Sequence, residues 1–228
     1  AGKLGLTEIN VINNVPGAFG IFRKSFLQQI GGWNTGTAED LDLTLRIKQY
    51  QGRHPELRFE FEPGAVSHTD VPDKLIDFLK QRLRWDGDLL YIYANKHRLG
   101  ISASIMGWNN FIFIMWYGIL FQIVMPFTIV LYMIYMIVVL PMPFFLASMT
   151  LVYLFYFCLT LIQFLLYLAV ISDRPRKDSS AFLIIPIYPL FQFAVRLWSA
   201  LAISNQILNK GHLDSAMAPF WVLKKGKQ

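Results

Sequence analysis

The chain has 228 residues, of which 54% are hydrophobic and only 16% are charged, a composition too apolar for a typical soluble domain. Residues 1–98 carry 13 Lys and Arg against 12 Asp and Glu, whereas residues 99–228 carry 8 against 3. The basic excess therefore lies in the apolar half, where it suits an anionic membrane leaflet better than nucleic acid. The single cysteine, Cys158, excludes an intrachain disulfide and fits a soluble part that faces the cytoplasm.

The first informative segment reads NNVPGAFGIFR, residues 13–23. Its Pro-Gly pair marks a turn, and residues 18–22 are predicted to form a short buried strand. Gly17 and Ala18 carry little or no side chain. This lack of bulk either lets a ligand approach the backbone or only permits tight packing.

Two helices are predicted next. Residues 24–30 form the first, which is expected to stop at Gly31-Gly32. The second begins near Ala38 and runs to about Tyr50. On one face of this second helix the sequence places Leu41, Leu45 and Lys48.

Acidic residues fill the start of the second helix. Glu39 and Asp40 lie in its first turn and Asp42 follows. Acids here oppose the helix dipole, and Thr35 or Thr37 is a candidate N-cap. That structural role explains one acid, but it does not require three after a glycine-rich loop. We therefore interpret Asp40 as a candidate general base toward a sugar hydroxyl.

Alternation of apolar and polar residues predicts a half-exposed strand over Leu57–Glu62, and a second short strand is predicted over Ala65–Thr69. Pro72 is expected to open a further helix. Its apolar stripe predicts an amphipathic helix lying in a membrane interface. The stripe consists of Leu75, Leu79, Leu83 and Leu90.

Off that stripe, the helix carries Gln81, Arg84 and Trp85 at i, i+3 and i+4, so they project from one side. The Arg84 guanidinium is a donor fork suited to phosphate, and the Trp85 indole is a flat plate suited to stacking on a sugar ring. Basic and aromatic residues next to a membrane segment are also common interfacial anchors. From these residues alone, both interpretations stand.

Residues 99–172 contain no formal charge, which is length enough for at least two membrane-spanning helices. Pro141-Met142-Pro143 is the natural break, so spans are predicted near residues 111–139 and 144–171, with Pro126 as a candidate kink. The loop at residues 173–178 is short and basic and is expected to be cytoplasmic, which places residues 1–98 on the same side.

A third apolar segment runs from Ala181 to about Leu208 and is predicted to be re-entrant or broken at its prolines. It contains Arg196, an intramembrane cation that either faces a polar path through the membrane or snorkels to an interface. The lysines of the tail, residues 209–228, favour a cytoplasmic location.

Taken together, these motifs resemble the membrane-embedded family 2 glycosyltransferases, the group of cellulose, hyaluronan and poly-N-acetylglucosamine synthases. The segment GAFGIFRKSFLQQIGGW is similar to the family's segment before its acidic motif, and Ala38-Glu39-Asp40 is similar to the Thr-Glu-Asp motif itself, with Ala in place of Thr. Gln81-Arg82-Leu83-Arg84-Trp85 matches the family's Q-x-x-R-W in full. The end FWVLKKG resembles the F-x-V-T-x-K-G gating loop, with Leu223 replacing Thr.

The resemblance implies a role for each matched residue. Asp40, with Glu39 beside it, is the catalytic base, and Gly17 and Ala18 lie at the acceptor. Trp85 stacks on the acceptor sugar. Gln81, Arg84 and Lys225 bind the donor diphosphate. Apart from the resemblance, the location of Arg196 in the third apolar segment makes it a candidate for the translocation path.

The resemblance also implies an architecture: the C-terminal part of an α/β GT-A-type domain (residues 1–98), a helical transmembrane region (99–208) and a basic cytoplasmic tail (209–228). We identify no separate D-x-D motif for a metal-bound nucleotide, because the D-x-D spacings at residues 40–42 and 86–88 belong to the acidic motif and to the residues just after Q-x-x-R-W. We therefore expect Mg²⁺ or Mn²⁺ to be held upstream, in an N-terminal half supplied by the same chain or by a separate one. The expected location is the bacterial inner (plasma) membrane, with the catalytic part in the cytoplasm.

The predicted function is inverting transfer of a sugar from a nucleotide-sugar, such as a UDP-sugar, to a growing polysaccharide that crosses the membrane. A first alternative is a non-processive enzyme that adds one sugar to a lipid, for which Arg196 is dispensable. A second is a channel or transporter subunit without activity, which leaves the matched motifs without a joint explanation.

Overall fold

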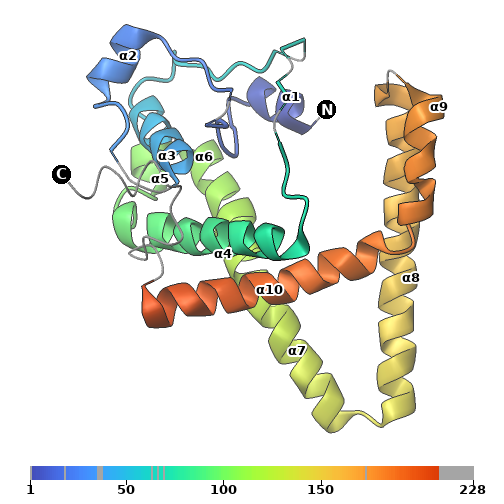
Figure 1. The fold of residues 1–228 in the computed structure, drawn as a ribbon. Coiled ribbons are helices and arrows are strands. Elements are labelled where there is room, and N and C mark those ends of the chain that lie inside the picture. Colours follow the sequence, from blue (N-terminus) through green and yellow to red (C-terminus); the bar gives the residue numbers. More distant parts are fainter. Residues whose placement is uncertain are drawn as a thin grey trace. The chain divides into compact units, whose positions relative to one another are not determined.

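We describe the fold from a computed structural model (Figure 1). The described residues are 2–17, 19–34, 38–62, 64–65, 67–68, 70–172 and 174–210. They belong to two compact units, one made of residues 1–125 with 201–228 and the other of residues 126–200.

The first unit contains six α-helices and two π-helical stretches among its described residues. They are α1 (Gly2–Glu8), α2 (Lys24–Gln29), α3 (Glu39–Gln51), α4 (Leu75–Tyr91), η1 (Ile92–Lys96), α5 (Ala103–Met106), α6 (Trp108–Phe113) and η2 (Ile114–Val124). The second unit contains most of α7 (Met125–Val139), all of α8 (Met142–Leu166), η3 (Tyr167–Ile171), α9 (Pro175–Asp178) and η4 (Ser179–Ile184), and the first half of α10 (Tyr188–Asn209).

The expected α/β GT-A-type fold is wrong for the part of the chain that the structure describes, which contains helices and no β-strand. Residues 57–62 are not in a ladder, although their alternation is typical of a strand. Two side chains pair with this segment: the Asn10 amide donates to Leu57 O (2.7 Å) and accepts from Phe59 N (3.0 Å), and Gln51 Nε2 also donates to Leu57 O (3.1 Å). Alternation predicts a half-buried extended chain, but a strand also needs a neighbouring backbone.

The other two predicted strands are also absent from the described residues. Residues 19–22 adopt no ladder, and Ala18 lies outside the described residues. The predicted strand at 65–69 falls partly on residues that are likewise outside, and those that are described, 65, 67 and 68, are not in a strand.

The predicted stop at the end of α2 is confirmed. Gly31 adopts φ +84°, Gly32 N donates to Leu27 O (2.8 Å) and Gly31 N donates to Gln28 O (3.2 Å). This is the Schellman pattern, in which glycine takes the left-handed position that ends a helix.

Helix α3 is close to its predicted length and lies at the centre of the first unit. Its Leu41 and Leu45 pack in a buried cluster with side chains from η1, α5 and η2, namely Ile92, Tyr93, Met106 and Ile114. At its C-terminal end, a Cβ atom on Gly52 would lie 1.9 Å from Ile105 O. Glycine therefore permits the close packing of α3 on α5.

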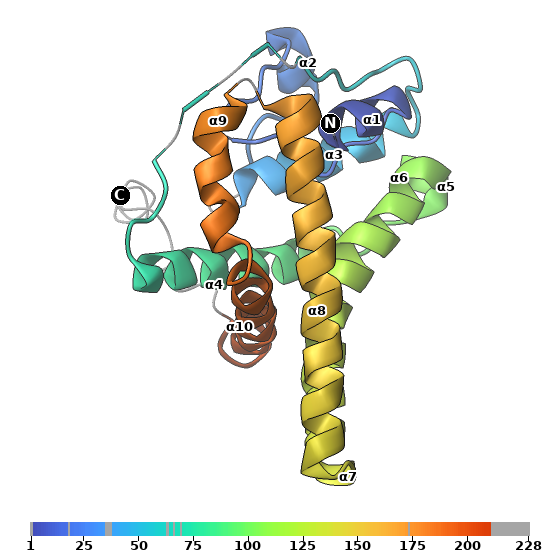
Figure 2. The same ribbon diagram turned by 90° about the vertical axis from the view of Figure 1, so that its right-hand side faces the viewer.

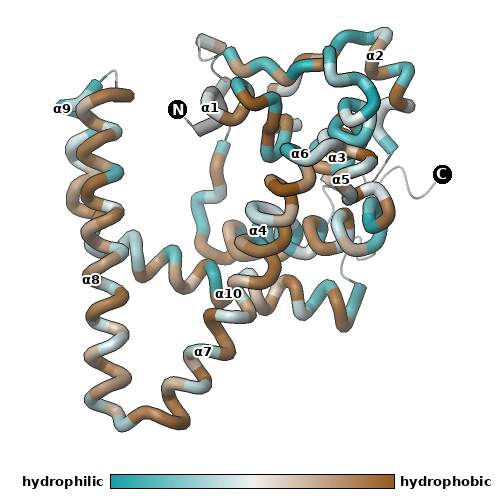
Figure 3. Tube along the Cα trace, turned by 180° about the vertical axis from the view of Figure 1, so that it is seen from behind, coloured by the Kyte–Doolittle hydropathy of each residue, from teal (hydrophilic) through white to brown (hydrophobic). Residues whose placement is uncertain are grey.

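Two continuous helices are long and apolar enough to cross a membrane: Trp108–Val139 and Met142–Ile171 (Figure 3). They correspond to the spans predicted near residues 111–139 and 144–171. Within the first, the π-helical η2 ends at Val124, two residues before Pro126. A π-helical adjustment is one way in which a helix accommodates a proline, which has no N–H to donate.

The third apolar segment is broken, as predicted. Residues Pro175–Ile184 and Tyr188–Asn209 form two helices whose axes differ by 66°. Pro186 lies in the break, and its carbonyl accepts a hydrogen bond from the Tyr153 hydroxyl of α8 (3.1 Å). Figures 1 and 2 show η4 and α10 meeting at this bend.

Candidate active site

The predicted base, Asp40, lies in the first turn of α3 and is half-buried. Its Oδ2 accepts a hydrogen bond from Asn14 Nδ2 (2.7 Å), and its Oδ1 accepts one from Leu41 N (2.8 Å). The N-cap of α3 is Ala38 in a left-handed conformation (φ 47°), with no side-chain cap. The predicted caps Thr35 and Thr37 lie outside the described residues.

The segment before α2 is fixed against this turn. Val15 N donates to Thr44 Oγ1 (3.0 Å), and the Thr44 hydroxyl donates to Asp40 O (2.7 Å). A Cβ atom on Gly17 would lie 3.4 Å from Glu39 Oε1 and 3.6 Å from Asp40 Cβ. The structure therefore brings Gly17, Glu39 and Asp40 together. Ala18, predicted beside Gly17, lies outside the described residues.

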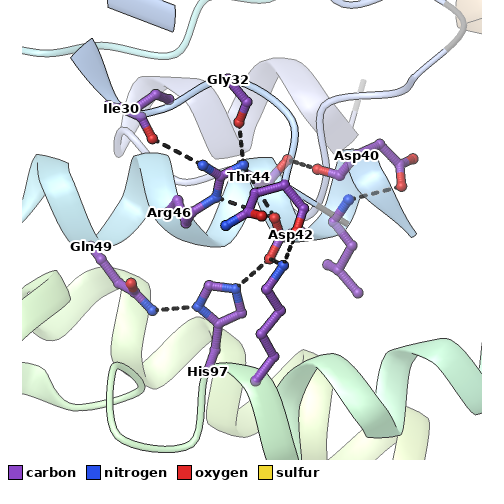
Figure 4. A network of polar contacts seen from close by, with 11 residues as sticks. Ile30, Gly32, Asp40, Asp42, Thr44, Arg46, Gln49 and His97 are labelled. Atoms are coloured by element: carbon purple, nitrogen blue, oxygen red, sulfur yellow. Dashed lines mark hydrogen bonds and ion pairs between the residues drawn. The ribbon is translucent and has the colours of Figure 1, made fainter. Parts of the chain in front are cut away.

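The third acid of α3, Asp42, has a different environment (Figure 4). Its side chain is fully buried and is paired with Arg46 Nη2 (3.1 Å), Lys96 Nζ (2.9 Å) and His97 Nε2 (2.7 Å). Burial alone would raise the pKa of Asp42. Hydrogen bonds from His97 and Lys96 and the charges of Lys96 and Arg46 outweigh burial, so the pKa falls to about 2. The Asp42 carboxylate is thus ion-paired with internal cations and has a low pKa, which makes it a poor proton acceptor.

The cations around Asp42 also bind the backbone of the loop that follows α2. Arg46 donates to Ile30 O (2.9 Å) and to Gly32 O. Lys96 Nζ donates to Asn34 O (2.7 Å). Each of these cations therefore joins the buried carboxylate to the loop that precedes Asp40.

A second buried charged group lies further along α3. Lys48 is 1% exposed, and its Nζ lies 5.1 Å from the centre of the Phe113 ring, a cation–π contact. No described carboxylate is within ion-pair distance of Lys48. Burial lowers the pKa of Lys48 to about 7, because an ammonium group loses its hydration there.

Helix α4 carries the residues predicted to bind the donor diphosphate, Gln81 and Arg84, and the acceptor sugar, Trp85. Trp85 is 49% exposed, and the Arg82 guanidinium lies 5.7 Å from its ring centre while pairing with Asp86 (3.1 Å). Gln81 and Arg84 are half-buried, and neither forms a hydrogen bond or ion pair with another described residue. The guanidinium of Arg84 therefore has no polar partner among the described residues.

The predicted site residues are not all brought together. Among the described residues, no hydrogen bond or ion pair joins Asp40 to α4, although both lie in the first unit (Figure 1). Arg196 lies in α10, within the second unit, and already has an interaction of its own. Lys225 lies outside the described residues, which contain no group of three His, Cys, Asp or Glu able to hold a metal ion.

Sequence reasoning missed several residues of this site. Asn14 and Thr44 orient Asp40, while Lys96 and His97 bind Asp42 across more than fifty residues of sequence. The i, i+4 spacing of Asp42 and Arg46 was the one local signal that Asp42 forms an internal ion pair.

Comparison with known proteins agrees with the motifs. The model of the family described as "Glycosyl transferase family group 2" matches residues 11–204. The poly-β-1,6-N-acetyl-D-glucosamine synthase of Staphylococcus epidermidis (strain RP62A) is 31% identical over 75 residues, which are 32% of this chain and 17% of that protein. The enzyme of the same name from Staphylococcus aureus (strain COL) is 31% identical over 86 residues, 36% of this chain and 19% of that protein.

These alignments cover about a fifth of the relatives' length, and no solved structure matches the chain. The family model, in contrast, covers most of the chain and includes α3, α4 and both apolar helices. The chain belongs to glycosyl transferase family group 2.

Proposed function

We propose that this chain carries the acceptor-activating part of a membrane-bound, inverting polysaccharide synthase that uses a nucleotide-sugar donor. The observation that carries the proposal is the set of contacts around the Asp40 carboxylate. Its carboxylate is held by Asn14 and by the Leu41 amide, lies beside Gly17, and forms no ion pair with another described residue. Unlike Asp42, it is oriented without being paired to a described cation, and a general base requires such an oriented, available carboxylate.

In the proposed reaction, a hydroxyl of the acceptor glycan attacks the anomeric carbon of the donor sugar. Asp40 takes the hydroxyl proton as the new glycosidic bond forms. The bond from the anomeric carbon to the diphosphate breaks on the opposite side, and its electron pair leaves with the nucleotide diphosphate. Attack from the side opposite the leaving group inverts the anomeric configuration.

Helix α4 supplies the residues proposed to stabilise the leaving diphosphate and to bind the acceptor sugar. The unpaired donors of Arg84, with Gln81 one turn earlier, stabilise the negative charge that develops on the leaving diphosphate. The half-exposed indole of Trp85 stacks on the acceptor sugar, and the neighbouring Arg82 holds its ring. The donor sugar is proposed to be a UDP-linked N-acetylhexosamine, by similarity to the two synthases named above.

The apolar helices Trp108–Val139 and Met142–Ile171 support a location in a membrane, for which we propose the plasma membrane with residues 1–98 on its cytoplasmic side. Export of the polymer past Arg196 belongs to the same proposal. The described residues offer no three-ligand metal cluster, so no step is assigned here to Mg²⁺ or Mn²⁺, whose ligands we expect elsewhere in the protein.

The proposal is tested by sizing the products. Membranes that contain the full protein are supplied with a panel of labelled UDP-sugars, and the products are separated by size. We expect a high-molecular-weight glycan from one donor, and we expect Asp40→Asn to abolish it. Glu56→Gln, a change at an exposed acid outside the site, serves as the control and is expected to keep the wild-type yield.

Each other outcome has a defined meaning. A single labelled sugar on a lipid would replace the polymer synthase by the non-processive enzyme. Full polymer from Asp40→Asn would refute the assignment of the base. No incorporation from any donor, in membranes where the protein is folded, would favour the channel or transporter subunit.

A further inference from the structure

We propose that Asp42 is a positioning residue, which sets the spacing between the base on α3 and the diphosphate-binding residues on α4. This inference rests on the proposed function. The geometry on which it depends is the buried cluster of Asp42 with Arg46, Lys96 and His97 (Figure 4).

The cluster adds a polar link between two helices that also share an apolar cluster, in which Leu89 and Tyr91 of α4 pack against the group that contains Leu41 and Leu45 of α3. Asp42 lies two residues after Asp40 on α3. Lys96 and His97 lie at the end of η1, which continues α4 without a break from Tyr91. The Asp42 carboxylate therefore links the helix of the base to the helix that carries Gln81, Arg84 and Trp85.

The link is short and closed to water. Asp42 is 0% exposed and His97 is 7% exposed, and their contact at 2.7 Å is the shortest in the cluster. The second ring nitrogen of His97 is hydrogen-bonded to Gln49 Nε2 (2.9 Å), which returns to α3. The imidazole is thus held on both sides by residues of α3, so that neither helix shifts without breaking a buried polar contact.

The same cluster fixes the chain that leads into Asp40. Arg46 binds the carbonyls of Ile30 and Gly32, and Lys96 binds that of Asn34. Asp42 orients both cations through ion pairs. Loss of the carboxylate would therefore release the loop before α3 and the end of η1 together.

Misplacement of the base has a characteristic kinetic result. A displacement of about 1 Å in an active site costs roughly 100-fold in rate, because the reacting groups leave their near-attack geometry. Hydrolysis of the donor by water does not need the acceptor hydroxyl to lie at Asp40. A positioning role thus predicts that transfer falls more than hydrolysis, whereas general unfolding would lower both equally.

The experiment uses the full protein in nanodiscs with labelled UDP-N-acetylglucosamine and measures polymer formation and free sugar in the same reaction. We expect Asp42→Asn to lower the ratio of transfer to hydrolysis about 10- to 100-fold through kcat, with little change in the donor KM. We expect His97→Gln, which keeps a hydrogen-bond donor, to retain more of the ratio than His97→Ala. His54→Gln, at an exposed histidine paired with Glu56, is the matched control and should keep the wild-type ratio.

If Asp42→Asn does not accumulate as folded protein, Lys96→Met provides the same test from the α4 side, with Lys24→Met as its control. An unchanged ratio in the folded Asp42 or Lys96 variants, or equal loss in His97→Gln and His97→Ala, would overturn the inference. Its failure is distinguishable from failure of the proposed function. In the first case Asp40→Asn still abolishes transfer, whereas in the second it does not.

Discussion

Replacement of Lys48 by methionine is expected to stabilise the protein at neutral pH. The Lys48 amine is buried against the Phe113 ring without a described acidic partner, and its pKa falls from 10.5 to about 7 on folding. The folded state therefore binds this proton more weakly than the unfolded state does. Stability must rise with pH between about 7 and 10.5, and the full range corresponds to about 5 kcal/mol.

The measurable part of this effect lies in an accessible pH interval. Between pH 7 and pH 9, the free energy of unfolding of the wild type should rise by about 2 kcal/mol from Lys48 alone. Methionine keeps an unbranched chain and a favourable contact with the aromatic ring. Lys48→Met should therefore be more stable than the wild type by about 2–4 kcal/mol at pH 7, after the lost cation–π contact is deducted.

Unfolding would be followed by tryptophan fluorescence during denaturant titration in a mild detergent, at pH 7 and pH 9. Other groups titrate in this interval, so the informative quantity is the difference between wild type and variant. Lys24→Met, at an exposed lysine of α2, is the control and should show no pH-dependent difference. An equal difference between wild type and Lys48→Met at both pH values would show that the amine titrates normally, and would refute the reasoning.

Three further predictions follow from single contacts. Gly52→Ala places a Cβ atom 1.9 Å from Ile105 O and should cost about 3 kcal/mol in thermal unfolding, whereas Gly5→Ala, with nothing within 4 Å, should cost nothing. Arg84→Lys loses the planar donor fork and should lower kcat/KM for the donor about 100-fold; a loss below about threefold would argue against diphosphate binding. Asp42 has a folded pKa of about 2 against 3.8, so its stabilisation is present above pH 3.8 and is lost as the pH falls through 2, a change of about 2 kcal/mol that Asp42→Asn should abolish.

Local features of the fold were predictable from the sequence. The stop of α2 at two glycines, the start of α3 and the two apolar helices each depend on neighbouring residues. The position of Lys48 on the face of Leu41 and Leu45 also follows from helical spacing, and the structure buries it there. Periodicity predicts the face on which a residue lies, but it does not predict that a lysine on this face remains without an acid.

Features that depend on distant partners were not predictable. The alternating segment at residues 57–62 indicates an extended chain, yet the groups that pair with it are the side chains of Asn10 and Gln51. Likewise, Asp40 and Asp42 are two similar acids in one sequence motif. Only the location of Lys96 and His97 distinguishes them, because these residues neutralise Asp42 and leave Asp40 available. Such a distinction arises from tertiary contacts.

The bend between η4 and α10 has a consequence for the chemistry of the neighbouring helix. A sharp turn in a helix releases backbone oxygens from their usual donors, and hydrocarbon offers no solvent to replace them. The phenolic hydroxyl of Tyr153 compensates by donating to Pro186 O. A tyrosine that looks like one more aromatic residue among apolar neighbours therefore supplies the hydrogen-bond donor that this carbonyl oxygen needs. The hydrogen bond of the Tyr153 hydroxyl group to Pro186 O therefore matters more at this position than the apolar character of the ring.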